Sequence, residues 1–168
     1  MLLQAKGDLA AAGPLLCEAV EVQRETLGDR HPSTLFSISN LGLLLKAKGD
    51  HAAAGPLLRE ALKGRRETLG NRHPHTLASI SNLGALLQTQ GDLAAAEPLY
   101  REALKGRRET LGSRHPDTLT SISNLGWLLK AKGDLAAAEP LLRQAVEGQR
   151  EALGNRHPNT LFLSLIHI

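Results

Sequence analysis

Apolar residues recur along this chain with the spacing of an amphipathic helix. Between residues 75 and 90, Leu77, Ile80 and Leu83 begin a stripe of positions three or four residues apart, which predicts a helix. A second stripe over 92–110 comprises Leu93, Ala96, Leu99, Tyr100, Ala103 and Leu104. Gly91-Asp92 separates the two, because Gly91 suits a left-handed C-terminal cap and Asp92 suits an N-cap. The pattern therefore predicts a helical hairpin.

The same pattern recurs every 42 residues along the chain. His-Pro pairs begin at His31, His73, His115 and His157, and Gly-Asp pairs at Gly7, Gly49, Gly91 and Gly133. A fixed period in this range is typical of stacked repeats, each of which buries its apolar face against its neighbours. We therefore expect an all-α fold, an α-solenoid of stacked antiparallel helix pairs.

The period divides the chain into one array with incomplete ends. The array covers residues 1–159, with a partial repeat at 1–27 and complete hairpins at 33–69, 75–111 and 117–153. Residues 1–6 match the end of a first helix, so residues 8–27 are expected to form the second helix of that pair. Thr160-Leu161 begins another first helix and residues 162–168 abandon the repeat, so residues 160–168 are expected to be the truncated start of the next helix or a non-native tail.

Prolines and glycines mark fixed positions within each hairpin. One set of prolines precedes the first helix, where the fixed φ angle favours the opening turn. Gly64, Gly106 and Gly148 fall inside the second helix and are interpreted as close-packing or bending points. The Arg-Arg-Glu-Thr strings at 65–68 and 107–110 lie near the ends of the second helices of two successive hairpins. Helix-end electrostatics explains their alternating charge.

Composition and charge narrow the classes of partner. The net charge of +3 is mild and only 2% of residues are aromatic, so nucleic acid is not indicated. No apolar run approaches the roughly 20 residues of a membrane helix, and no secretory signal is visible. The single cysteine, Cys17, cannot form an internal disulfide. We expect a soluble, cytoplasmic protein that binds neither membrane nor nucleic acid.

Catalytic and metal-binding patterns are not found in the sequence. It contains no phosphate-cradling glycine loop, nucleophile elbow or convergent acid pair. The recurring histidines would be separated by two helix layers of about 8–10 Å each, whereas zinc ligands lie about 2 Å from one ion. The chain is therefore not expected to be an enzyme, and neither a metal nor another cofactor is expected.

The repeat resembles a known family. Leu83-Gly84, Leu87, Gly91-Asp92, Ala96, Tyr100 and Ala103 match the tetratricopeptide pattern. The 42-residue period, the HPxT entry and the segment GDLAAAEPLYREAL are similar to the kinesin light chain type of this repeat. The resemblance covers nearly the whole chain and implies a right-handed superhelix. Because no heptad coiled coil precedes the repeats, the chain resembles a fragment and not a complete light chain.

The resemblance also implies a binding surface. In this family the first helix of each pair lines a concave groove that takes an extended peptide, often an acidic one containing an aromatic residue. The corresponding positions are Phe36, Asn40, Leu43 and Lys46 in the first complete hairpin, Ala78, Asn82, Ala85 and Gln88 in the second, and Thr120, Asn124, Trp127 and Lys130 in the third. The asparagine is constant among them, while several of its neighbours vary.

Each of these positions has a second interpretation. The three asparagines are candidates to clamp a peptide backbone, since an amide both donates and accepts, or to tie adjacent helices together. Trp127 is either a ligand anchor or a gap filler, and Lys46 and Lys130 either attract acidic peptides or are merely solvated. The leading hypothesis is a non-catalytic module or scaffold that binds a partner peptide. The alternative is a structural array that self-associates weakly through its uncapped, exposed ends.

Overall fold

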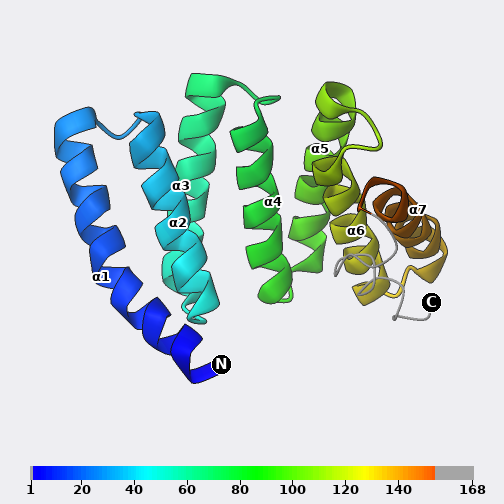
Figure 1. The fold of residues 1–168 in the computed structure, drawn as a ribbon, viewed down its shortest axis with the longest axis horizontal. Helices are drawn as coiled ribbons and strands as arrows, with labels where there is room; N and C mark the ends of the chain where they lie inside the picture. Colours follow the sequence, from blue (N-terminus) through cyan, green and yellow to red (C-terminus); the bar gives the residue numbers. More distant parts are fainter. Residues whose placement is uncertain (1, 154–168) are drawn as a thin grey trace. The chain divides into compact units, whose positions relative to one another are not determined.

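The computed structural model describes the backbone of residues 2–153 and the side chains of residues 12–151. This part of the chain is entirely helical apart from turns (Figure 1). The helices are α1 (Leu2–Leu27), α2 (Pro32–Ala47), α3 (His51–Leu69), α4 (Pro74–Thr89), α5 (Leu93–Leu111), α6 (Pro116–Ala131) and α7 (Leu135–Leu153). None of the described helices is long and apolar enough to cross a membrane. The tail at 160–168 lies outside the described residues.

The chain forms two compact units, Met1–Leu86 and Leu87–Ile168. In the first unit α2 packs against both α1 and α3, and the three helices lie side by side (Figure 1). In the second unit α6 packs in the same way against α5 and α7. Each unit thus places a first helix of the repeat between two second helices.

Glycine and aspartate end and restart the helices as the sequence predicts. Gly91 adopts a φ of 83°, which is the left-handed region that favours glycine. One residue later, the Asp92 carboxylate accepts a hydrogen bond from the Ala95 backbone N–H at 3.0 Å. Asp50 and Asp134 cap α3 and α7 in the same manner. These caps satisfy backbone donors that the first helical turn leaves open.

The recurring histidine also proves to be a cap. The Nδ1 atom of His31 accepts a hydrogen bond from the Ser33 backbone N–H at 3.2 Å, immediately before α2. His73 and His115 make the equivalent contact before α4 and α6. Histidine is not among the preferred N-cap residues, so the sequence pattern offered no reason to expect this role. The His-Pro pair therefore serves as a helix-starting element.

The start of α1 differs from the prediction. Helix α1 begins at Leu2 and continues through Gly7-Asp8, where the sequence predicts a turn and a new helix at residue 8. A turn between two helices is stabilised when each helix is long enough to be stable and the two pack on each other. Six residues are too few for a stable helix, so the continuous helix costs less than the break.

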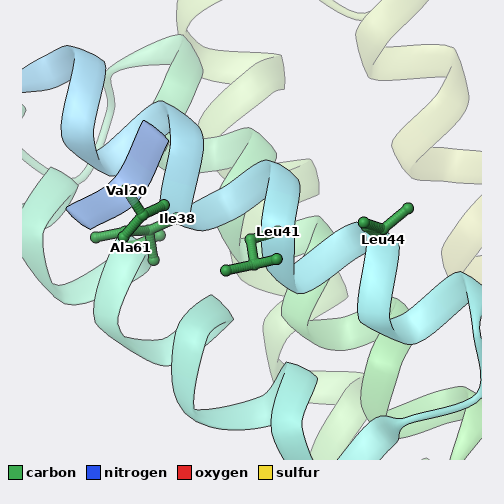
Figure 2. Close-up of a cluster of buried hydrophobic side chains, with 5 residues drawn as sticks. All are labelled: Val20, Ile38, Leu41, Leu44 and Ala61. Carbon is green, nitrogen blue, oxygen red and sulfur yellow. The ribbon is translucent and has the colours of Figure 1, made fainter. Parts of the chain in front are cut away.

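The core of the first unit is formed by small and branched side chains from three helices. Figure 2 shows Val20 of α1, Ile38 of α2 and Ala61 of α3 meeting at one point, with Leu41 and Leu44 further along α2. These side chains are all buried. Because the three elements meet here, the core fixes the position of α2 relative to both of its neighbours.

A glycine allows a close helix contact in each unit. A Cβ atom added to Gly64 would lie 2.4 Å from Leu35 Cδ2, and one added to Gly148 would lie 2.4 Å from Leu119 Cδ2. No larger residue fits without displacement of the leucine. These glycines are therefore close-packing points, one of the two roles that the sequence suggests.

Candidate functional site

A narrow stripe of accessible residues runs along α2 through Phe36, Asn40 and Leu43. Phe36 is 57% exposed, while Asn40 and Leu43 are half-buried. Residues between them, such as Ile38 and Leu41, are buried. The twelve residues predicted from the sequence all retain accessible surface, with Phe36 and Thr120 exposed and the others half-buried. The prediction thus selects positions that a ligand can reach.

The twelve residues fall into two groups. The group in the first unit comprises Phe36, Asn40, Leu43, Lys46, Ala78, Asn82 and Ala85. The group in the second unit comprises Gln88, Thr120, Asn124, Trp127 and Lys130. Each group lies on the first helices of its own unit.

The three asparagine side chains reach the surface of their helices. Asn40, Asn82 and Asn124 are half-buried, and no hydrogen bond from another described residue engages their amides. An amide that reaches the surface offers a carbonyl acceptor and two N–H donors. The three amides therefore keep donors and an acceptor that no described residue engages.

Two predicted residues are engaged within the second unit. The Gln88 side-chain carbonyl accepts a hydrogen bond from the Tyr100 hydroxyl at 2.9 Å, and burial raises the pKa of Tyr100 to about 12. The Thr120 hydroxyl donates to the Pro116 carbonyl at 3.0 Å. The Gln88 carbonyl and the Thr120 hydroxyl therefore each form a hydrogen bond within the chain in the absence of a ligand.

The aromatic residue of the second unit lies beside a cation. The Lys130 ammonium lies 5.2 Å from the centre of the Trp127 ring, within the range of a cation–π interaction. Trp127 is half-buried, so part of its ring remains at the surface. In the first unit, burial lowers the pKa of Lys46. Both lysines are thus partly removed from water on the predicted surface.

A cavity of about 370 Å³ opens beside Phe36 in the first unit. Its walls come from all four helices of that unit, and its lining residues are Gln23, Pro32, Ser33, Phe36, Ser37, Arg65, Leu69 and His75. The Gln23 side-chain carbonyl oxygen is buried and has no hydrogen-bond partner among the described residues. The cavity combines an exposed aromatic ring with an open acceptor.

Arg65 supplies the charge in this cavity. Its guanidinium donates to Ser79 Oγ at 2.6 Å and to the carbonyls of His75 at 3.4 Å and Leu35 at 3.5 Å. The residue is 6% exposed, and this burial lowers its pKa. Within the described residues no carboxylate forms an ion pair with it. The cavity wall therefore carries a buried cation whose charge is not neutralised.

The second unit has a similar arrangement, but Arg107 is half-buried where Arg65 is buried, and an acid lies near it. Arg107 donates to Ser121 Oγ at 2.6 Å and to the Asp117 carbonyl at 3.4 Å. Burial lowers the pKa of Arg107, and the Asp117 carboxylate acts in the opposite direction and raises it. Asp117 occupies the repeat position of His75. The second unit thus supplies its own acid where the first unit has none.

Comparisons with known proteins identify the repeat. The model of the family described as tetratricopeptide repeat matches residues 1–67, 37–109 and 76–151. The chain belongs to the tetratricopeptide repeat family. No curated protein sequence matches it.

Solved structures place these tetratricopeptide repeats with the kinesin light chain type. The putative kinesin light chain of Podosopora anserina, with nearly identical repeats, shares 32% identity at a TM-score of 0.81, over 95% of this chain and 76% of that one. A second crystal structure, of a point variant of that protein, gives the same values. BtubC (BKLC) from P. vanneervenii shares 25% identity at a TM-score of 0.80, over 91% of this chain and 61% of that one.

These findings confirm the all-α solenoid of helix pairs and the kinesin light chain-like repeat type. Tetratricopeptide repeats are in general protein-interaction modules, and their family is a scaffold family without catalytic activity. The chain spans 61% of the length of BtubC, so it matches part of that protein.

Arg65, the charged residue of the cavity beside Phe36, is not among the residues predicted from the sequence. The string at 65–68 alternates in charge, which favours a solvated helix surface, and this charge pattern alone does not distinguish Arg65 from the exposed Arg66. The available signal is the register of the helix. Arg65 follows Ala61 and Leu62 by four and three positions, which places it on the apolar face.

Proposed function

We propose that this chain is a non-catalytic interaction module that binds an acidic peptide segment of a partner protein along the accessible stripes of its first helices. In the first unit, the cavity beside Phe36 takes a carboxylate of the peptide against Arg65 and an apolar or aromatic side chain against the Phe36 ring. In the second unit, the half-buried ring of Trp127 and the amide of Asn124 provide an aromatic and a polar contact.

Arg65 is the observation that carries the proposal. A buried charge is costly unless an opposite charge or hydrogen bonds offset the loss of hydration. Three acceptors surround its guanidinium, but none of them is an anion. Arginine binds carboxylates through paired N–H donors, which makes a carboxylate the best complement to this wall.

The asparagines support an extended peptide in particular. An extended backbone has N–H and C=O groups that its own chain does not satisfy. The amides of Asn40 and Asn82 offer both a donor and an acceptor at the surface of the first unit. Contacts of this kind do not depend on the side chains of the peptide, so sequence selectivity comes from the cavity.

Calorimetric titration with a peptide that has one aromatic residue flanked by acidic residues tests the proposal. We expect Arg65→Gln to weaken binding about tenfold or more, since a hydrogen bond to a charged group contributes roughly 1.5–3 kcal/mol. Glutamine is the residue that this chain itself has at the equivalent positions Gln23 and Gln149, so the helix tolerates it. Phe36→Ala is expected to weaken binding as well.

Two further variants serve as matched tests. Arg107→Gln makes the same change in the second unit, where Asp117 already provides an anion, and is expected to have a much smaller effect. His75→Asp copies the arrangement of Asp117 into the first unit and is expected to weaken binding as strongly as Arg65→Gln. Binding that is equally strong in the wild type, Arg65→Gln and His75→Asp would refute the proposed cavity.

The proposal also includes a cellular compartment and the absence of a cofactor. The lone cysteine is compatible with a reducing compartment, from which we infer action in the cytoplasm; a fluorescent fusion confined to another compartment would contradict this. The proposed interaction uses shape, charge and hydrogen bonding alone and requires no cofactor.

A further inference from the structure

Ionic contacts join neighbouring second helices within each unit. In the first unit, Arg24 of α1 donates to both carboxylate oxygens of Glu60 in α3 at 2.8 Å. In the second unit, Arg108 of α5 occupies the same repeat position, but its partner in α7 is the neutral Gln144, at 3.2 Å. The equivalent contact thus leaves the charge of Arg108 without a carboxylate.

A neighbouring ion pair, present in both units, shows that only one carboxylate has been lost from the second unit at these contacts. Arg30 pairs with Glu67 at 2.7 Å in the first unit, and Arg114 pairs with Glu151 at 3.0 Å in the second. These pairs occupy equivalent repeat positions and keep opposite charges in both units. Only at Gln144, among these described contacts, does a neutral amide replace the acid.

A cavity of about 270 Å³ lies next to Arg108. Its lining residues are Arg101, Leu104, Lys105, Arg108, Glu109 and Leu125. Leu104 and Leu125 are buried and form an apolar wall, whereas the three cations and one acid, Glu109, are exposed, which leaves the lining with an excess of positive charge. The cations follow one another by four and three positions, so they share one face of α5.

The equivalent face of α1 has a different charge. Cys17, Glu21 and Arg24 stand where α5 has its three cations, and Glu60 neutralises Arg24. In the second unit, Arg101 pairs with Glu97, which also accepts a hydrogen bond from Lys132. Glu97 is thus shared between two cations and neutralises neither Lys105 nor Arg108. The same three cations recur in α3 as Arg59, Lys63 and Arg66, so α5 differs from α3 in its neighbour α7, where Gln144 stands at the repeat position of Glu60 and Glu102.

We propose that the cavity between Arg101, Lys105 and Arg108 is a second binding site, which takes an acidic side chain of a protein partner. A carboxylate on an alkyl stem matches its composition, since the stem contacts Leu104 and Leu125 while the carboxylate meets the cations. Arginine and lysine both bind carboxylates through charge-assisted hydrogen bonds. The apolar wall favours such a side chain over inorganic phosphate, which has no apolar part. The charged residues of this site lie on α5 and Leu125 lies on α6, and the site shares no lining residue with the cavity beside Phe36.

Amide shift mapping of the whole chain with a hexaglutamate peptide tests this site separately from the first. We expect saturable shifts in residues 101–108 of the wild type. Gln144→Glu restores the carboxylate that Arg24 has in Glu60 and is expected to weaken binding at these residues about fivefold or more. Ala136→Glu adds the same charge at an exposed position elsewhere on α7 and is expected to have less than a twofold effect.

The outcomes distinguish the two sites. Arg65→Gln must leave the shifts of residues 101–108 unchanged, whatever happens at residues 33–37. The site is refuted if the wild type shows no saturable shift at residues 101–108, or if Gln144→Glu and Ala136→Glu weaken binding equally. Inorganic phosphate that displaces hexaglutamate at equal concentration would overturn its assignment to a peptide side chain.

Discussion

At the scale of single residues, one position of the repeat serves different purposes in different copies. Arg65 and Arg107 both donate to a serine in the following helix, at 2.6 Å in each case. Gln23 and Gln149 stand at the same position, and both have a buried carbonyl oxygen without a hydrogen-bond partner among the described residues. The frame therefore tolerates either residue, and charge at this position is available for recognition.

Glu97 gives a pH-dependent prediction at this scale. Hydrogen bonds from Lys132 and then Arg101 hold the pKa of Glu97 below its ordinary value of 4.5, against the opposing effect of burial. Because the folded state has the lower pKa, the stabilisation is full above the unfolded pKa and is lost as the pH falls through the folded one. We therefore expect acid to reduce the free energy of unfolding more in the wild type than in Glu97→Gln.

Chemical denaturation at a series of pH values between about 6 and 3 measures this difference. Gln is the appropriate replacement because it keeps the shape and removes the titration. Parallel stability curves for the two proteins below pH 4.5 would show that the contacts of Glu97 with Lys132 and Arg101 do not contribute to folding.

At the scale of helices, much of the structure is predictable from the sequence because each signal is local. Gly91-Asp92 contains both the cap that ends α4 and the cap that starts α5. The continuation of α1 through Gly7 could not be predicted in this way, since the same Gly-Asp pair occurs there. What differs is the length of helix available for packing, which is a tertiary property and not a local one.

The close contact of Gly64 predicts a large effect of a small change. We expect Gly64→Ala to lower the free energy of unfolding by about 1–3 kcal/mol from overpacking against Leu35, partly offset by the roughly 1 kcal/mol that alanine gains in helix propensity. Lys63→Ala, at an exposed position of the same helix, is the control and should change stability little. Thermal or urea unfolding of both variants measures the difference, and equal stability of Gly64→Ala and the wild type would contradict the packing argument.

The candidate site was harder to predict than the helices. The family resemblance implied Phe36 and Asn40 as surface positions of a first helix, and both retain accessible surface on α2. The burial of Arg65 depends on the packing of α3 against its neighbours. The first unit has His75 where the second has Asp117, and this difference is significant only because Arg65 is buried. Charge that is significant because it is buried cannot be recognised from charge patterns alone.

At the scale of the whole molecule, the arrangement of α1 bears on self-association. Val22 stands at the repeat position of Gly64 and Gly148, and it is 51% exposed. In the first unit, Leu35 of α2 packs against Gly64 of α3. If a first helix of another copy packed on α1 in the same way, its leucine at the repeat position of Leu35 would meet the Val22 side chain. At Gly64, a Cβ alone would already lie 2.4 Å from Leu35 Cδ2. The repeat geometry therefore disfavours head-to-tail stacking of copies through α1.

Light scattering at increasing protein concentration tests this expectation. We expect the measured mass to stay constant, because the steric conflict at Val22 prevents a second copy from continuing the array. A mass that grows with concentration, and that returns to a single value when residues 160–168 are removed, would instead support the self-associating array.

The central claim is that Arg65 recognises a carboxylate of a bound peptide, and a double-mutant cycle tests it most directly. Binding is measured for the wild type and Arg65→Gln, each with the acidic peptide and with versions in which one carboxylate is replaced by its amide. We predict that for one carboxylate the two changes are not additive and give a coupling free energy of about 1 kcal/mol or more. Additive effects for every carboxylate of the peptide would contradict the account.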